Sequence, residues 1–359
     1  MKTEDVSLNC LSARIHEETA IDTKLDLGEL KEQPLQILWQ HYAITENYRQ
    51  ITSEKIVLNG FVYVDLLYLG RAEEQEETLF HKSERVEFTQ FIPLQKEQRG
   101  RKWSLAKVDF RNQGLHARIE KKEDGQDCFH MTGTLQSCVF LYEEQTNEMT
   151  IDAYHLEKDF HCKFKTIGQK DLSFLTTIEI PVRDVVQLHD GAKAEAALCC
   201  RCTPLQWKVQ VEKNRMMLTG SLQVVSLWKA GDVFHTLKSR HDFQQSVEVE
   251  GLTPDMRVDL DLSVRDCRLT FLNERQMEIA CNLAAVCDGY CEKELIFLEE
   301  PVFVEGNSPQ HGGMVITAVE TEETIWDLAK RHRTTRGRIK EVNHLDHEPE
   351  KGEKLLIIR

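Results

Sequence analysis

The sequence has no long apolar run. The longest candidate, Phe61–Leu69, is interrupted by Asp65 and has the length of a strand, whereas a membrane-spanning helix needs about 20 consecutive apolar residues. The chain begins Met1-Lys2-Thr3-Glu4-Asp5, with acidic groups where a secretory signal needs a cationic start followed by an apolar stretch. These two absences predict a protein that stays in the cytoplasm.

Basic residues are too few for a nucleic-acid-binding protein. The 359 residues include 45 Lys and Arg against 60 Asp and Glu, which gives a formal net charge of −15. Phosphate backbones and anionic lipid surfaces both attract basic surfaces. The charge balance therefore argues against nucleic acid and membrane surfaces, and it favours a protein or a neutral ligand as the partner.

Recognisable catalytic motifs are also absent. The sequence contains no phosphate-binding loop, dinucleotide fingerprint, nucleophile elbow or His-Glu-x-x-His helix. We therefore predict no enzyme activity and no cofactor. An enzyme with a site between β modules is a remote alternative, because it would need a convergent polar cluster that the sequence does not show.

The eleven cysteines do not form a regular framework. Their odd number and irregular spacing suit reduced thiols better than paired disulfides. Two groups are dense: Cys199, Cys200 and Cys202, and then Cys281, Cys287 and Cys291. A zinc site needs four thiolate or imidazole ligands, commonly in closely spaced pairs, and neither group has a clear partner pair nearby in sequence. We expect no metal and interpret these cysteines as small apolar side chains on strand faces.

What the sequence does contain is a strand pattern that occurs four times. Each copy alternates apolar and polar residues around a central position and closes on an aromatic residue, which is typical of half-buried strands. The centre is Gly60, Gly133 or Gly220 in the first three copies and Cys281 in the fourth. A glycine inside a strand indicates a bulge or a close approach of another backbone. The four segments are Lys55–Tyr68, Cys128–Tyr142, Arg215–Trp228 and Gln276–Tyr290.

Other alternating stretches flank these copies. The preceding ones are Leu38–Ala43, Val108–Ile119, Leu205–Val211 and Val258–Phe271. Strands that contain phenylalanine follow three of the copies: Val86–Pro93, Phe160–Phe164 and His241–Val249. Long helical periodicity is missing from this region. The sequence therefore predicts a mainly β fold, with antiparallel strands in tandem sandwich-like or small-barrel modules.

Changes in composition and in hydrophobic pattern along the chain predict five segments. We expect a lead-in or docking arm and two β regions with two strand repeats each, then a turn-rich linker and a small C-terminal domain. The expected bounds are 1–34, 35–168, 169–306, 307–313 and 314–359.

The C-terminal domain begins with a short alternating strand, Met314–Val319. Thr321 is a suitable N-cap for a following amphipathic helix that ends near His332. Trp326 falls on the inward face of this helix, where it suits the core. An exposed aromatic contact is the alternative.

The second half of this domain predicts another helix and another strand. Thr335 can cap a helix that stops near Asn343, and a polar turn leads through Gly352 into the strand Lys354–Ile358. The expected order is strand, helix, helix, strand.

The C-terminal domain resembles a LysM domain. The matching motifs are Thr324–Ala329 at the start of the first helix, Ile339–Leu345 at the end of the second, and Lys351–Leu355 before the last strand. The resemblance implies a βααβ fold whose two loops form a groove for N-acetylglucosamine chains. Glu322-Glu323 stands where the family has Gly-Asp, and losing the glycine weakens the sugar-binding interpretation.

On this resemblance we predict that the two loops contact a partner or a glycan. The predicted contact residues are Thr321, Glu322, Glu323, Thr324, Ile325, Asn343, His344, Leu345 and Gly352.

The β region resembles the SPOCS domains of endospore-forming bacteria, on the motifs Val57–Tyr68 and Phe88–Pro93. Tandem SPOCS modules followed by one LysM domain is the layout of spore morphogenetic proteins made in the mother cell. The resemblance implies a scaffold at the forespore surface. Its LysM domain would bind a coat ATPase, a SpoIVA-like protein, and its β modules would assist coat assembly.

A second hypothesis is a peptidoglycan-binding cell-wall module that uses the same groove. It requires export, for which the sequence shows no signal, and the Glu322-Glu323 pair disfavours it as well. A peptidoglycan precursor remains an alternative secondary ligand of the scaffold.

Overall fold

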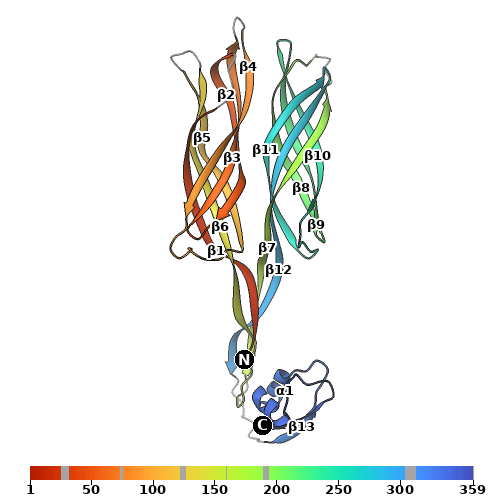
Figure 1. Ribbon diagram of the computed structural model, residues 1–359. Helices are drawn as coiled ribbons and strands as arrows, with labels where there is room; N and C mark the ends of the chain where they lie inside the picture. Colours follow the sequence, from red (N-terminus) through yellow and green to blue (C-terminus); the bar gives the residue numbers. More distant parts are fainter. Residues whose placement is uncertain are drawn as a thin grey trace. The chain divides into compact units, whose positions relative to one another are not determined.

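The computed structural model describes residues 1–25, 32–72, 76–121, 127–158, 160–188, 194–303 and 313–358. The chain divides into two compact units. The larger unit contains Asn9–Glu144 and Asp171–Cys291, and the smaller unit contains Met1–Leu8, Gln145–Lys170 and Glu292–Arg359. Long antiparallel strands dominate the fold (Figure 1), as the alternating sequence pattern predicts.

Strands β1 to β6 form the first module. They pair into two three-stranded sheets, in the orders β1-β6-β5 and β2-β3-β4. Side chains from both sheets share the same buried clusters, which makes the module a sandwich. The strands are β1 Lys2–Leu25, β2 Glu32–Ile51, β3 Lys55–Ala72, β4 Glu77–Pro93, β5 Leu105–Glu120 and β6 Cys128–Asp152.

Strands β7 to β12 form the second module with the same strand order. The sheets are β7-β12-β11 and β8-β9-β10, so each strand of the first module has a counterpart six strands later. Both sheets again contribute to one core cluster. The strands are β7 Phe160–Gln187, β8 Ala196–Glu212, β9 Arg215–Ala230, β10 Val233–Glu248, β11 Arg257–Asn273 and β12 Gln276–Phe303.

The four repeated sequence segments are the middle strands of the four sheets, β3, β6, β9 and β12. A middle strand has neighbours on both sides and one face in the core, so its alternation is the strictest in the sheet. In β3, buried residues occupy every second position from Ile56 to Gly70. The prediction that these four segments are strands is therefore confirmed.

The N-terminal segment differs from the expectation of a separate lead-in or docking arm. Lys2–Leu25 forms β1, which pairs with β6 in the first module. Its odd-numbered positions from Ala13 to Leu25 face inward, but Glu17 and Thr19 interrupt the apolar series there and conceal the period of two. The expected boundary between residues 168 and 169 falls inside β7, and most of the expected linker 307–313 lies outside the described residues.

Two of the central glycines have a phenyl ring packed against them. Gly60 of β3 is directly opposite Phe88 of β4, and Gly220 of β9 is directly opposite Phe243 of β10. A Cβ atom at Gly220 would lie 2.5 Å from Cζ of Phe243 and 2.8 Å from the carbonyl oxygen of Gln206. The glycine and the downstream phenylalanine of the sequence pattern thus pack against each other. The phenyl ring covers the glycine backbone, which has no side chain.

The C-terminal part of the smaller unit has the predicted order of strand, helix, helix and strand. Its core combines apolar residues from the two helices and the last strand with Val319, which directly follows the first strand. The elements are β13 Met314–Ala318, α1 Ile325–His332, α2 Arg336–Asn343 and β14 Lys354–Ile358, and β13 pairs with β14 in antiparallel fashion. Neither helix of the described residues has the length and apolar character needed to span a bilayer.

Gly220→Val is expected to lower the free energy of unfolding of the second module by about 3 kcal/mol, because the new side chain displaces Phe243 from the core. Denaturant unfolding measures the loss. Gly168→Val in β7 is the matched control, because a Cβ there meets nothing within 4 Å. Equal stabilities for the two variants would contradict the packing role of Gly220.

Candidate partner-binding site

The first loop of the C-terminal domain ends in a capping box. Thr324, and not Thr321 as expected, is the N-cap of α1. Its hydroxyl accepts a hydrogen bond from the Asp327 amide (3.3 Å), and the Asp327 carboxylate accepts one from the Thr324 amide (3.0 Å). The hydrogen bond from the Thr324 side chain lowers the pKa of Asp327. This reciprocal pairing, which a cap at Thr321 would lack, fixes where the loop ends.

The acidic pair before the cap divides into an exposed residue and a bound one. Glu322 is exposed and has a φ of 64°, in the left-handed region that favours glycine. The Glu323 side chain is 10% exposed and pairs with Arg331 at 3.1 Å. Arg331 also pairs with Glu320 at 2.9 Å. Glu322, the residue at the glycine position of the LysM pattern, is thus the one that the loop presents to solvent.

The second loop starts at the end of α2. The Asn343 side chain donates to the carbonyl oxygens of Ile339 (2.9 Å) and Leu356 (2.8 Å) and accepts from the Leu356 amide (2.7 Å). Its amide group is therefore used to tie α2 to β14. His344 is the C-cap, with a φ of 56°, and is exposed. Leu345 packs partly against the domain core.

Hydrogen bonds from backbone amides hold the two predicted loops together. The Ile325 amide donates to the Glu348 carboxylate at 2.8 Å. The Gly352 amide donates to the Val319 carbonyl oxygen at 2.9 Å, and the Val319 amide donates to the Glu353 carbonyl oxygen at 3.0 Å. The two loops that the sequence predicts as one site are therefore joined to each other by hydrogen bonds.

The predicted contact residues fall into two groups. Those exposed to solvent are Thr321, Glu322, His344 and Gly352. Those that hold the loops or the core are Glu323, Thr324, Ile325, Asn343 and Leu345, and Ile325 is 0% exposed. The loops can thus present four of the nine residues directly, while the other five fix their shape.

An apolar face on β13 was not predicted. Met314 and Ile316 are 67% and 71% exposed, and they point to the same side of the strand because they are two residues apart. The alternation in Met314–Val319 was visible in sequence, but which face the helices would cover was not.

Trp326 is buried, with 5% exposure, but its aromatic partner comes from a distant segment of the same unit. Its ring packs edge-on against Tyr154, with centroids 4.9 Å apart. Its indole nitrogen donates to Asp152 at 2.8 Å, and the Lys330 ammonium donates to both Asp152 oxygens at 2.7 and 2.8 Å. The Tyr154 hydroxyl donates to the Thr334 carbonyl oxygen at 2.7 Å. We call this group the Trp326 anchor.

Asp152 is the ionised centre of the Trp326 anchor. Burial alone would raise its pKa, but the hydrogen bonds from Lys330 and Trp326 outweigh this effect and lower it. Sequence reasoning missed Asp152 and Tyr154, because they lie more than 170 residues before their partners and no local pattern distinguishes them.

Residues 194–272 match the family model described as SipL, SPOCS domain. No curated protein and no solved structure matches the chain. The matched residues contain β8, β9, β10 and nearly all of β11, four of the six strands of the second module. This match supports a SipL-like protein with a sporulation-related role.

Glu322→Gly is expected to stabilise the C-terminal domain by about 1 kcal/mol, because glycine adopts a positive φ without the steric cost of a Cβ atom. Thermal unfolding of the full chain measures the change. Glu323→Gly is the control: it removes the Arg331 ion pair from a normal backbone position and should destabilise. A loss of stability in both variants would contradict the assigned strain.

Asp152→Asn is expected to weaken the Trp326 anchor by about 2 kcal/mol, because two charge-assisted hydrogen bonds from Lys330 are lost. Hydrogen exchange of the α1 amides measures the effect. Asp346→Asn, an exposed change in the same domain, should leave exchange unaltered.

The Trp326 anchor should also respond to acid. The folded pKa of Asp152 lies below its ordinary value of 3.8, so its contribution is present above that pH and is lost as the pH falls through the folded value. Protection of α1 in wild type should fall over this range towards that of Asp152→Asn. A difference in α1 protection between wild type and Asp152→Asn that stays the same at every pH would contradict the role of the carboxylate.

Proposed function

We propose that this protein is a non-enzymatic scaffold of spore morphogenesis. In this proposal, both six-stranded modules are SPOCS modules, and the C-terminal βααβ domain is a LysM domain that binds a SpoIVA-like coat ATPase. The protein would act in the mother cell at the forespore surface, where the β modules assist coat assembly.

The observation that carries this proposal is the match of residues 194–272 to the SipL SPOCS model. The identical strand order of β1–β6 and β7–β12 supports extending the module assignment to the first half of the chain. Equivalent pairs, Gly60 with Phe88 and Gly220 with Phe243, support the same extension. The order of the C-terminal elements agrees with the LysM resemblance.

The surface of the C-terminal domain favours a protein partner over a sugar chain. Glu322 and His344 are exposed in the two joined loops, while the polar groups of Glu323 and Asn343 are already used within the domain. The exposed side chains of Met314 and Ile316 add apolar area of the kind that protein interfaces bury.

The test is a binding assay between the purified full chain and the SpoIVA-like ATPase of the same sporulating cells. Changing Glu322 to Lys and His344 to Ala together should weaken binding about tenfold, which corresponds to about 1.4 kcal/mol. Glu294→Lys is the matched control. It makes the same charge change at an exposed position of β12, outside the βααβ domain, and should bind like wild type.

Soluble peptidoglycan fragments serve as the second ligand of the assay. Binding to them is expected to be feeble and unchanged by the double substitution. Tight binding of the fragments, lost in the double variant, would reject the partner assignment in favour of the cell-wall module. Full capture of the ATPase by the double variant would reject the loop assignment.

A further inference from the structure

Four cysteines from three strands of the second module meet in one cluster. Cys200 and Cys202 lie on β8, Cys267 on β11 and Cys281 on β12. The Cys267 sulfur lies 2.9 Å from that of Cys200 and 2.7 Å from that of Cys281. Cys202 shares hydrogen bonds with Cys267 and Cys281. The proposed scaffold function does not use this cluster.

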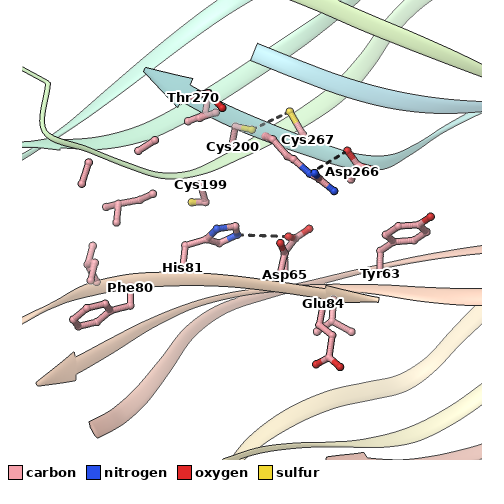
Figure 2. Close-up of a pocket in the computed structure, with 18 of the residues that line it drawn as sticks. Tyr63, Asp65, Phe80, His81, Glu84, Cys199, Cys200, Asp266, Cys267 and Thr270 are labelled. Atoms are coloured by element: carbon pink, nitrogen blue, oxygen red, sulfur yellow. Dashed lines mark hydrogen bonds and ion pairs between the residues drawn. The ribbon is translucent and has the colours of Figure 1, made fainter. Parts of the chain in front are cut away.

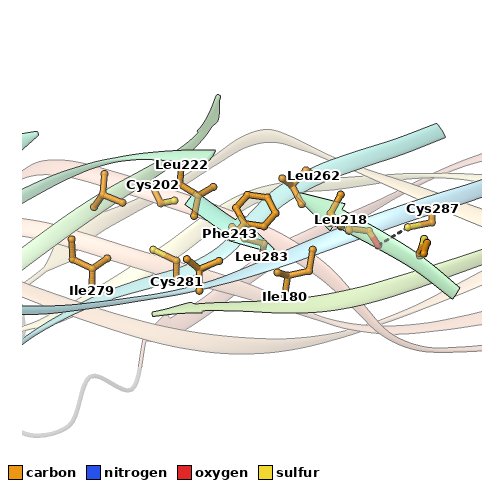
Figure 3. Packing of buried hydrophobic residues seen from close by; sticks show 14 of the residues in the cluster. Ile180, Cys202, Leu218, Leu222, Phe243, Leu262, Ile279, Cys281, Leu283 and Cys287 are labelled. Carbon is orange, nitrogen blue, oxygen red and sulfur yellow. Dashed lines mark hydrogen bonds between the residues drawn. The ribbon is translucent and has the colours of Figure 1, made fainter. Parts of the chain in front are cut away.

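Two of these cysteines also border a cavity of about 830 Å³ in the larger unit. Figure 2 shows the Cys200 and Cys267 side chains directed toward one another at its wall, with Cys199 nearby. A cavity of this size admits a small molecule. Cys281 is 2% exposed, and Figure 3 shows it with Cys202 among the apolar side chains of the core.

The sulfur separations fit thiol chemistry better than metal binding. Sulfurs around a tetrahedral zinc ion, with bonds of about 2.3 Å, stand about 3.8 Å apart. The separations at Cys267 are about 1 Å shorter than that. Among the described residues, no group of three or more Cys, His, Asp or Glu is arranged to hold a metal ion.

We propose that Cys200 and Cys267 form an oxidation site that closes to a disulfide when a small disulfide enters the cavity. The bond would join β8 to β11, which lie at the edges of the two facing sheets, and so lock the module that matches the SPOCS model. Cys267 and Cys281, in contrast, are direct neighbours in the β11–β12 ladder, where a bond adds little to existing strand pairing.

The reaction is thiol–disulfide exchange. The Cys200 thiolate attacks one sulfur of the small disulfide, which forms a mixed disulfide and releases one small thiolate. The Cys267 sulfur then attacks the Cys200 sulfur, forms the Cys200–Cys267 bond and releases the second small thiolate. The protein loses two electrons and two protons, and the oxidant leaves as two thiols.

The cluster can hold negative charge on sulfur. Hydrogen bonds from the thiols of Cys267 and Cys281 lower the pKa of Cys202. Hydrogen bonding with Cys200 raises the pKa of Cys267, which favours Cys267 as the second sulfur to react. Burial raises the pKa of Cys199 to about 11, which disfavours its thiolate.

The test treats the full chain with 2-hydroxyethyl disulfide, blocks the remaining thiols, and maps the tryptic peptides by mass. The tryptic peptides separate the partners of Cys267: 194–201 contains Cys199 and Cys200, 202–208 contains Cys202, 266–268 contains Cys267, and 276–293 contains Cys281, Cys287 and Cys291. The expected product joins 194–201 to 266–268, with two thiols lost from the eleven. Dithiothreitol should reverse this, and the melting temperature should rise on oxidation and fall on reduction.

Cys199→Ser is the matched control and should keep the crosslink, whereas Cys200→Ser should abolish it. If Cys200→Ser does not fold, differential alkylation of the wild type before and after oxidation still identifies the lost thiols. A crosslink between 266–268 and 276–293, a stable mixed disulfide without a crosslink, or zinc bound in equimolar amount to the purified protein would each overturn the proposal.

Discussion

A phenyl ring lying on the bare backbone of a middle strand is the contact on which each module depends. Phe88 on Gly60 and Phe243 on Gly220 connect a middle strand to its neighbour at the point where the two sheets share their core. Any side chain at the glycine would occupy the space of the ring. The aromatic ring stays in the core because the residue opposite it has no side chain to occupy the same space. The two strands that carry these glycines, β3 and β9, are each the middle strand of a sheet.

Much of the β architecture could be predicted because middle strands carry a strict period of two. The segments around Gly60, Gly133, Gly220 and Cys281 were recognisable for that reason, and each is the centre of a sheet. Edge strands have weaker patterns. In β1, Glu17 and Thr19 occupy inward positions, so the alternation could not be separated from irregular sequence. The end points of the C-terminal elements were also predictable, apart from the N-cap of α1. The sequence predicts Thr321 as this cap, but the reciprocal hydrogen bonds with Asp327 place it at Thr324.

Contacts between distant strands could not be predicted. The dense group Cys199, Cys200 and Cys202 has no ligand-like partner nearby in sequence, yet the sandwich brings Cys267 and Cys281 to it from β11 and β12. The same limit applies to the predicted loops. Sequence indicated that both belong to one site, but local pattern could not show that Asn343 and Glu323 are occupied by internal bonds. The positions that these loops leave exposed, such as Glu322 and His344, are held in place by the occupied residues.

The Trp326 anchor has a practical bearing on how this protein can be dissected. A chain shortened before Met314 would leave the Tyr154 ring and the Asp152 carboxylate uncovered, since Trp326, Lys330 and Thr334 satisfy them in the intact molecule. Such a fragment would lack the C-terminal domain and would also expose the Tyr154 ring, which favours nonspecific association. Single substitutions in the loops of the C-terminal domain change its surface without exposing the Tyr154 ring, whereas a deletion does both at once.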